Sequence, residues 1–266
     1  MGRDRVCKVS LLSHQKMSLF EIALEVILVL TLGIVAEVGG LAKLFGLMNS
    51  FLRTQPTILP KDLNVGFGVK FDEIHKVFAS VLRKVKPISM TKVDPTFPQP
   101  EIQVIPLLIF SNVSQNEDLN ALLKICDFPF TSLGLEMMTC GIQVIPPGVQ
   151  TSFHQENYYG LLKYYLVLQG HEKASITIRE LRKVANSAQS VVSKDQVHQL
   201  RAKSSLLFDS TVPLKVDNLS NQTVHILCCE FRRPFSKLPD IVNRIVMKII
   251  AVSPLVVAAC SQCWSK

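Results

Sequence analysis

The chain has 266 residues, of which 48% are hydrophobic and 19% charged, and its mean hydropathy is +0.28. This composition excludes an intrinsically disordered protein and leaves room for one or two domains with a sizeable core. The net charge is +8, but Lys and Arg residues are spread along the chain without a long basic run or interleaved aromatic residues. Nucleic acid is therefore not an expected partner.

A basic tail and an apolar segment open the chain. Residues 1–18 carry four Lys or Arg side chains, and residues 19–48 are mostly apolar around a charge-free centre at 26–36. That centre is shorter than the roughly 20 residues that span a bilayer, and a longer span takes in three glutamates. A signal anchor, a cleaved signal peptide and a buried or interfacial helix all remain open. The first two predict membrane contact through residues 19–48 and a lumenal C-terminal domain in the endoplasmic reticulum or secretory pathway.

Residues 49–100 are predicted to be a linker that contains one helix. Phe71 to Lys86 places apolar side chains three and four residues apart, with acidic residues near the start and basic residues toward the end. This pattern predicts an amphipathic helix packed on the domain. The following stretch, residues 87–100, contains four prolines and reads as a loop.

Residues 101–239 contain short apolar runs separated by turn residues, which predicts a mainly β protein, either a barrel or a sandwich. Strands are expected at 102–110, 133–145, 149–154, 161–169, 174–179, 204–209 and 223–231, with a short helix at 116–126. The polar stretch 178–199 is read as a helical or loose insertion. The tail, residues 240–266, is apolar and is expected to form a helix that covers the barrel or lies on a membrane surface.

An ordered set of motifs runs through this region. Pro147-Gly148 is followed after five residues by His154, then by an apolar strand, by Leu207–Thr211, and by a last strand that leads into Arg233-Pro234. Over roughly residues 135–238 this order resembles the aspartyl/asparaginyl β-hydroxylase family. The resemblance implies a double-stranded β-helix, which is a jelly-roll or cupin-like barrel with flanking helices and an N-terminal hydrophobic helix. It also implies an iron- and 2-oxoglutarate-dependent dioxygenase that acts on a protein side chain.

The resemblance also assigns residues to the site. His154 stands at the family's first iron-binding histidine, whereas the second histidine position holds Leu214. His225 or Asp209 would then have to supply the replacement ligand. Lys163 would hold the carboxylate of 2-oxoglutarate in place of an arginine. Iron(II) and 2-oxoglutarate are the expected cofactors if the barrel is active, and the alternative is an inactive barrel that serves as a membrane-anchored binding or structural module.

Two further patterns bear on the compartment. Asn112, Asn218 and Asn221 each head an Asn-X-Ser/Thr sequon, and these are glycosylation candidates if the domain enters the secretory pathway. The seven cysteines show no paired zinc spacing, and an odd number leaves at least one thiol without an intramolecular partner. Their pairing stays open at this stage.

Overall fold

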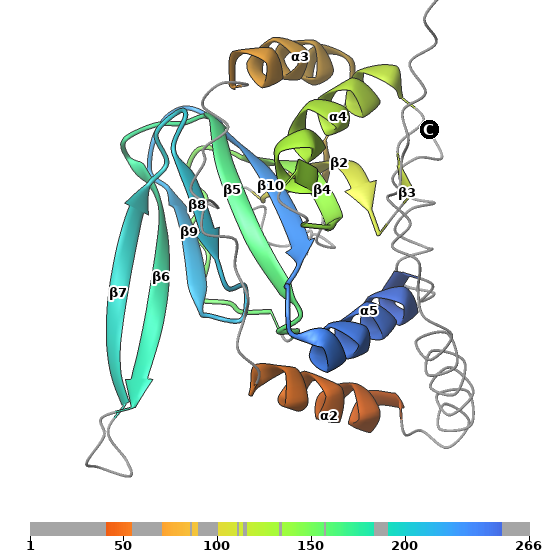
Figure 1. Cartoon of the computed structure of the whole chain (residues 1–266). Helices are drawn as coiled ribbons and strands as arrows, with labels where there is room; N and C mark the ends of the chain where they lie inside the picture. Colours follow the sequence, from red (N-terminus) through yellow and green to blue (C-terminus); the bar gives the residue numbers. More distant parts are fainter. Residues whose placement is uncertain are drawn as a thin grey trace, which may run out of the picture. The chain divides into compact units, whose positions relative to one another are not determined.

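The computed structural model describes residues 41–54, 71–85, 87–89, 101–110, 112–113, 116–132, 135–156, 158–183 and 191–251. The chain divides into two compact units, residues 1–47 and residues 48–266. The predicted barrel, whose strands are labelled in Figure 1, lies within the second unit. The basic tail at 1–18 and most of the apolar segment at 19–48 lie outside the described residues. None of the described helices is long and apolar enough to cross a membrane.

Two antiparallel sheets build the second unit. The larger sheet follows the order β1-β2-β4-β10-β5-β8, with β3 paired to β2, and the smaller sheet follows the order β7-β6-β9. The strands of the larger sheet are β1 (Ile88–Ser89), β2 (Gln103–Ile109), β3 (Asn112–Val113), β4 (Met137–Ile145), β5 (Leu161–Gln169), β8 (Ser205–Phe208) and β10 (Val224–Arg232). The strands of the smaller sheet are β6 (Ala174–Lys183), β7 (Val191–Gln199) and β9 (Leu214–Asn218).

The order of pairing identifies the fold. Between β4 and β5, the bridges Gln150–Asp217 and His154–Leu214 place residues 150–154 beside β9 in the smaller sheet. We count residues 150–154 as the second strand of the series that runs from β4 to β10. The first strand of this series then pairs with the last, the second with the seventh, the third with the sixth, and the fourth with the fifth. This nested pairing across two sheets is the winding of a jelly roll, so the predicted mainly β, cupin-like fold is confirmed.

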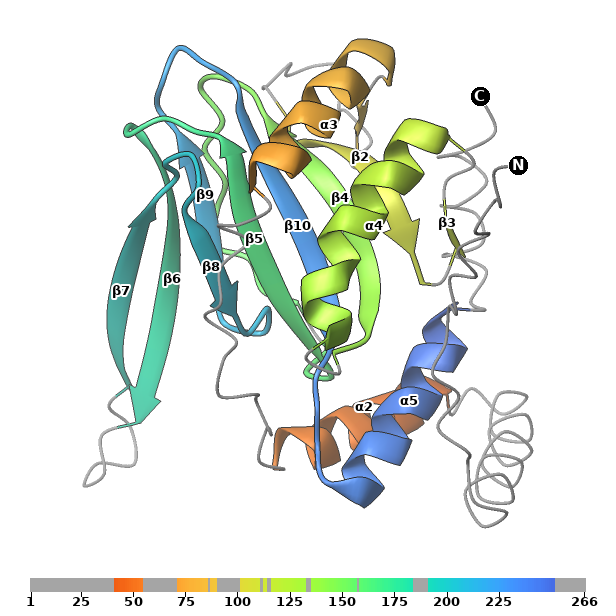
Figure 2. The ribbon, with the colours of Figure 1, turned by 45° about the horizontal axis from the view of Figure 1, so that its top comes forward.

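Strand β10 separates two hydrophobic cores, because alternate residues of a strand point to opposite faces of the sheet. Leu227, Cys229 and Phe231 belong to an outer core that also contains side chains of helices α3 (Phe71–Lys84) and α4 (Glu117–Ser132). Val224 and Ile226 belong to an inner core between the two sheets. Figure 2 shows α3 and α4 lying across the face of the larger sheet formed by β4, β10 and β5.

A buried amide ties helix α5 (Lys237–Ala251) to the barrel. The Nδ2 atom of Asn243 donates to the carbonyl oxygens of Gly160 at 2.9 Å and of Arg233 at 3.1 Å, and its Oδ1 atom accepts the Tyr158 hydroxyl at 2.6 Å. A Cβ atom at Gly160 would collide with Oδ1 of Asn243. Only glycine therefore allows this close approach.

The local predictions agree with the structure where an apolar pattern was strong. Strand β5 has the predicted bounds, and the amphipathic helix appears as α3. Other predictions were wrong: helix α2 (Leu41–Arg53) continues into the expected linker, and α4 runs six residues beyond the predicted end at Cys126, to Ser132. The polar stretch 178–199 is not a helix or a loose insertion, because most of it forms the paired strands β6 and β7.

Candidate functional site

A charged cluster lies on the inner face of the larger sheet, and we call Thr139, Glu156, Lys163 and Glu230 the Lys163 cluster. Glu230 on β10 is paired directly with Lys163 on β5 and with Thr139 on β4. The Lys163 ammonium lies 2.9 Å from Oε1 of Glu230 and also contacts Oε1 of Glu156. The Thr139 hydroxyl donates to the other oxygen of Glu230 at 2.6 Å. One cation therefore holds two carboxylates together inside the barrel.

The electrostatics of the cluster favour a charged lysine. Burial alone would lower the pKa of Lys163, but its anionic and ionisable neighbours, led by Tyr165 and Glu230, shift that pKa above its ordinary value. Burial raises the pKa of Tyr165, so the Tyr165 hydroxyl is neutral near pH 7. The two carboxylates are therefore the groups that keep the ammonium charged. The resemblance had assigned Lys163 to the carboxylate of 2-oxoglutarate, and the sequence had not singled out Glu156 as its partner.

His154, the predicted first iron ligand, lies at the edge of the smaller sheet. Its backbone bridges Leu214 through hydrogen bonds of 2.9 and 2.8 Å. The side chain is exposed, and its Nδ1 atom lies 3.3 Å from the carbonyl oxygen of Ser152. Leu214 is the position at which the resemblance expects a second histidine, and this leucine is buried in the inner core. His154 therefore has an apolar neighbour where a metal centre needs a ligand.

The two proposed replacement ligands are not brought to His154. His225 on β10 is paired with Val144 of the outer core and packs edge-on against Phe78 of α3, with ring centroids 5.2 Å apart. It thus lies on the opposite face of the sheet from the Lys163 cluster.

Both carboxylate oxygens of Asp209 already have partners in the folded chain. Its Oδ2 atom lies 2.9 Å from an Arg233 guanidinium nitrogen, and its Oδ1 atom accepts the backbone N–H and the hydroxyl of Thr211 at 2.9 and 2.7 Å. This is the geometry of a turn residue with an ion pair.

These residues do not fit an iron centre of the two-histidine, one-carboxylate kind. Within the described residues, no three His, Cys, Asp or Glu side chains are grouped so that they could hold a metal ion. The carboxylate that follows His154 by two residues, Glu156, is bound to Lys163. The predicted set His154, His225 and Asp209 is therefore not assembled.

A cavity of about 260 Å³ lies at the open side of the barrel, between β8 and the edge strand β7. Its walls include Tyr165 and Ile176 of the inner core and the hydroxyl-bearing Ser204. His198 pairs with Ile176, so its ring points to the same inner side. The Nε2 atom of His198 is buried and has no hydrogen-bond partner among the described residues. The cavity is thus lined by apolar side chains together with the polar residues His198 and Ser204.

The three sequons differ in their surroundings. Asn218 is fully buried, and its Nδ2 atom donates to three carbonyl oxygens at 2.9–3.0 Å. A glycan on that nitrogen would break this network, so the folded loop leaves no place for it. Asn221 is exposed, and the side chain of Asn112 lies outside the described residues.

Comparisons with known proteins give fold likeness only. No family model matches the chain, and no curated protein matches it. A 2OG-Fe(II) oxygenase family oxidoreductase from Burkholderia pseudomallei is 8% identical, with a TM-score of 0.47 over 59% of this chain and 78% of that chain. The α-ketoglutarate-dependent carbocyclase SnoK from nogalamycin biosynthesis is 10% identical, with a TM-score of 0.45 over 71% and 87%. A prolyl-4-hydroxylase from Pseudomonas putida is 17% identical, with a TM-score of 0.39 over 71% and 98%. Likeness of this degree assigns neither activity nor residue roles to this chain.

Replacing Lys163 tests the charged cluster. The Lys163→Met variant leaves Glu156 and Glu230 facing each other, and we expect it to lower the free energy of unfolding by about 2–3 kcal/mol at pH 7. Urea unfolding at pH 7 measures this, with Lys173→Met at an exposed loop position as the control. A loss no larger than that of the control would contradict this account.

Replacing His225 tests its burial. Burial lowers the pKa of His225 from its ordinary 6.5 to about 4. Between these values the unfolded chain binds a proton that the folded protein does not, so stability falls as the pH falls through this window, by about 1–2 kcal/mol. The His225→Leu variant should lose this part of the pH dependence in urea unfolding at pH 7 and pH 4.5. The control His154→Leu, which removes an exposed imidazole, should retain it.

Proposed function

We propose that this jelly roll is a non-catalytic binding or structural module. The observation that carries the proposal is the occupation of Lys163 by two carboxylates. The alternative, which the sequence resemblance implies, is an iron- and 2-oxoglutarate-dependent oxygenase that acts on a protein side chain. The arrangement of charges inside the barrel supports the non-catalytic module over the oxygenase.

At Lys163, 2-oxoglutarate would meet an ammonium group whose positive charge two glutamates already balance. An ammonium group binds the far carboxylate of 2-oxoglutarate when its own charge is not already neutralised. Here a third carboxylate would approach Glu156 and Glu230, and like charges at this spacing repel each other. Displacing Glu230, whose side chain is 17% exposed, would leave a largely buried carboxylate without its cation, which is costly.

The metal position supports the same proposal. A leucine opposite His154 supplies no lone pair, and it contributes to the inner core instead. The substitution thus replaces a metal ligand with apolar packing, which stabilises the barrel without a metal ion.

The cavity beside His198 supports a binding role. Its volume of about 260 Å³ suits a small ligand or one side chain of a protein partner. The His198 and Ser204 side chains that line the cavity would set the polar contacts of that ligand, while Tyr165 and Ile176 would pack against its apolar part.

Metal content and co-substrate binding test the proposal. We expect purified full-length protein, equilibrated with iron(II) under anaerobic conditions and desalted, to retain well under one equivalent of iron. It should also show no heat of 2-oxoglutarate binding by calorimetry and release no succinate. The His154→Ala variant should behave like the wild type in all three measurements, and His171→Ala provides a matched control.

One iron per chain that His154→Ala removes and His171→Ala retains would overturn the proposal in favour of the oxygenase. Turnover of 2-oxoglutarate that depends on His154 would do the same.

We further propose that residues 19–48 attach the chain to a membrane of the secretory pathway, with the barrel on the lumenal side. The basic tail before this apolar segment supports that orientation. In cells, the full chain should then resist alkaline extraction from membranes, and Asn221 should carry a glycan that Asn221→Gln removes. Recovery in the soluble fraction without a glycan would contradict the proposal.

A further inference from the structure

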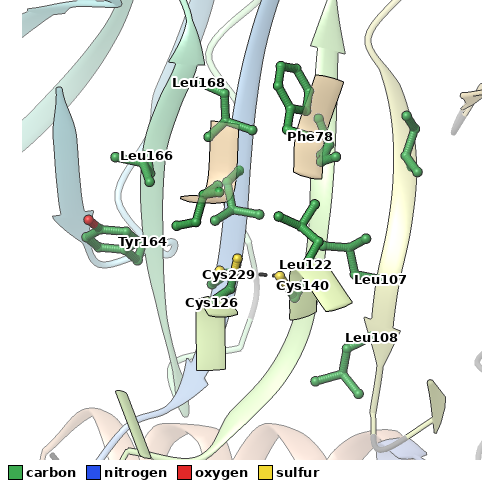
Figure 3. Close-up of a cluster of buried hydrophobic side chains, with 14 of the residues drawn as sticks. Phe78, Leu107, Leu108, Leu122, Cys126, Cys140, Tyr164, Leu166, Leu168 and Cys229 are labelled. Atoms are coloured by element: carbon green, nitrogen blue, oxygen red, sulfur yellow. Dashed lines mark hydrogen bonds between the residues drawn. The ribbon is translucent and has the colours of Figure 1, made fainter. Parts of the chain in front are cut away.

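Three buried cysteines meet in the outer core, away from the Lys163 cluster. Cys126 lies on α4, Cys140 on β4 and Cys229 on β10, and all three are closed off from solvent. Figure 3 shows their sulfur atoms together beneath the helix, with the Cys140–Cys229 contact marked. Neither the resemblance nor the proposed function uses these thiols.

Cys140 and Cys229 are directly opposite each other on neighbouring antiparallel strands. Their sulfur atoms are 3.5 Å apart in the reduced protein. Directly opposed residues of such strands have Cα atoms roughly 4.5–5.5 Å apart, which lies within the range that a disulfide spans. Small rotations of the two side chains therefore suffice to bring the sulfur atoms to bonding distance.

We propose that Cys140 and Cys229 are an oxidisable pair that forms a disulfide across the centre of the larger sheet. The oxidant that suits this site is hydrogen peroxide, which is small and uncharged, because burial excludes bulky disulfides such as oxidised glutathione.

The reaction has two steps. The thiolate of Cys140 attacks one peroxide oxygen, the O–O bond breaks, hydroxide leaves, and Cys140 becomes a sulfenic acid. The sulfur of Cys229 then attacks the Cys140 sulfur. The S–S bond forms as the S–O bond breaks, and the Cys229 proton leaves with the hydroxyl group as water. Two electrons pass from the two cysteines to the peroxide.

The three thiols are not equivalent in acidity. Hydrogen bonds from Cys126 and Cys229 lower the pKa of Cys140. Burial raises the pKa of Cys126 and of Cys229. Cys140 is therefore the thiol that ionises first, and its two neighbours remain protonated. This ordering makes Cys140 the nucleophile toward the oxidant and Cys229 the resolving thiol.

The neighbouring Cys228 provides a matched control. It adjoins Cys229 on the same strand, but its side chain packs against the inner core, on the other face of the sheet. Replacing either cysteine with alanine makes the same chemical change, yet only Cys229→Ala removes a sulfur atom from the outer core.

The experiment maps disulfides in the reduced, full-length protein after treatment with hydrogen peroxide. The treatment is repeated in urea below the unfolding transition, so that slow access to the core does not limit the result. Remaining thiols are blocked under denaturing conditions, and peptides are identified by mass spectrometry. We expect a Cys140–Cys229 cross-linked peptide that lacks two hydrogen atoms and disappears on reduction, and we expect Cys228→Ala to retain it.

The proposal is overturned if neither condition gives this peptide in wild-type protein, or if Cys140 is found linked to Cys126 instead. It is also overturned if oxidised glutathione modifies Cys140 in the folded protein as fast as peroxide does. Loss of the cross-link in Cys229→Ala together with its retention in Cys228→Ala supports the assigned pair.

Discussion

The structure depends on strand β10, which is hydrogen-bonded on both edges and buried on both faces. It is the last strand of the barrel in the chain, and it lies in the middle of the larger sheet, between β4 and β5. Because residues of a strand alternate between faces, two consecutive residues of β10 lie in different surroundings, one against the helices and the other toward the barrel interior. Cys229 faces the helices and Glu230 faces the barrel interior. A shift of one residue in this pairing would put the carboxylate against apolar helices and the thiol beside Lys163.

The same constraint explains why the site expected from the resemblance is not assembled. The motif order follows the chain, whereas a metal centre requires side chains on one face at one level of the barrel. His225 was a candidate replacement ligand, but its face of β10 is covered by α3. Inside the barrel, Lys163 balances the charges of Glu156 and Glu230, so its ammonium group already has two carboxylate partners.

Sequence analysis predicted the parts of the fold that bury a continuous apolar surface. Leu161 to Gln169 was predictable because β5 is buried along nearly its whole length, and α3 was predictable because its apolar residues follow one helical face. The first part of β6 was predicted, but its end and strand β7 were missed, because most residues of β7 are polar and exposed, so the pattern resembled a loop. The resemblance assigned Lys163 to a carboxylate of 2-oxoglutarate, whereas in the structure two glutamates contact it. Its partners could not be identified, because Glu230 meets it only through the nested pairing of the strands.

The thiol pair and the charged cluster are neighbouring rungs of one ladder. Cys140 pairs with Cys229, and the next residues, Thr139 and Glu230, pair beside them with side chains on the opposite face. Packed interiors transmit small displacements, so a change in the separation of β4 and β10 at one rung would be felt at the adjacent rung. Glu230 stands at that rung and contacts both Thr139 and the Lys163 ammonium. The strands β4, β5 and β10 each contribute side chains to both cores, so the outer core and the barrel interior share these three strands.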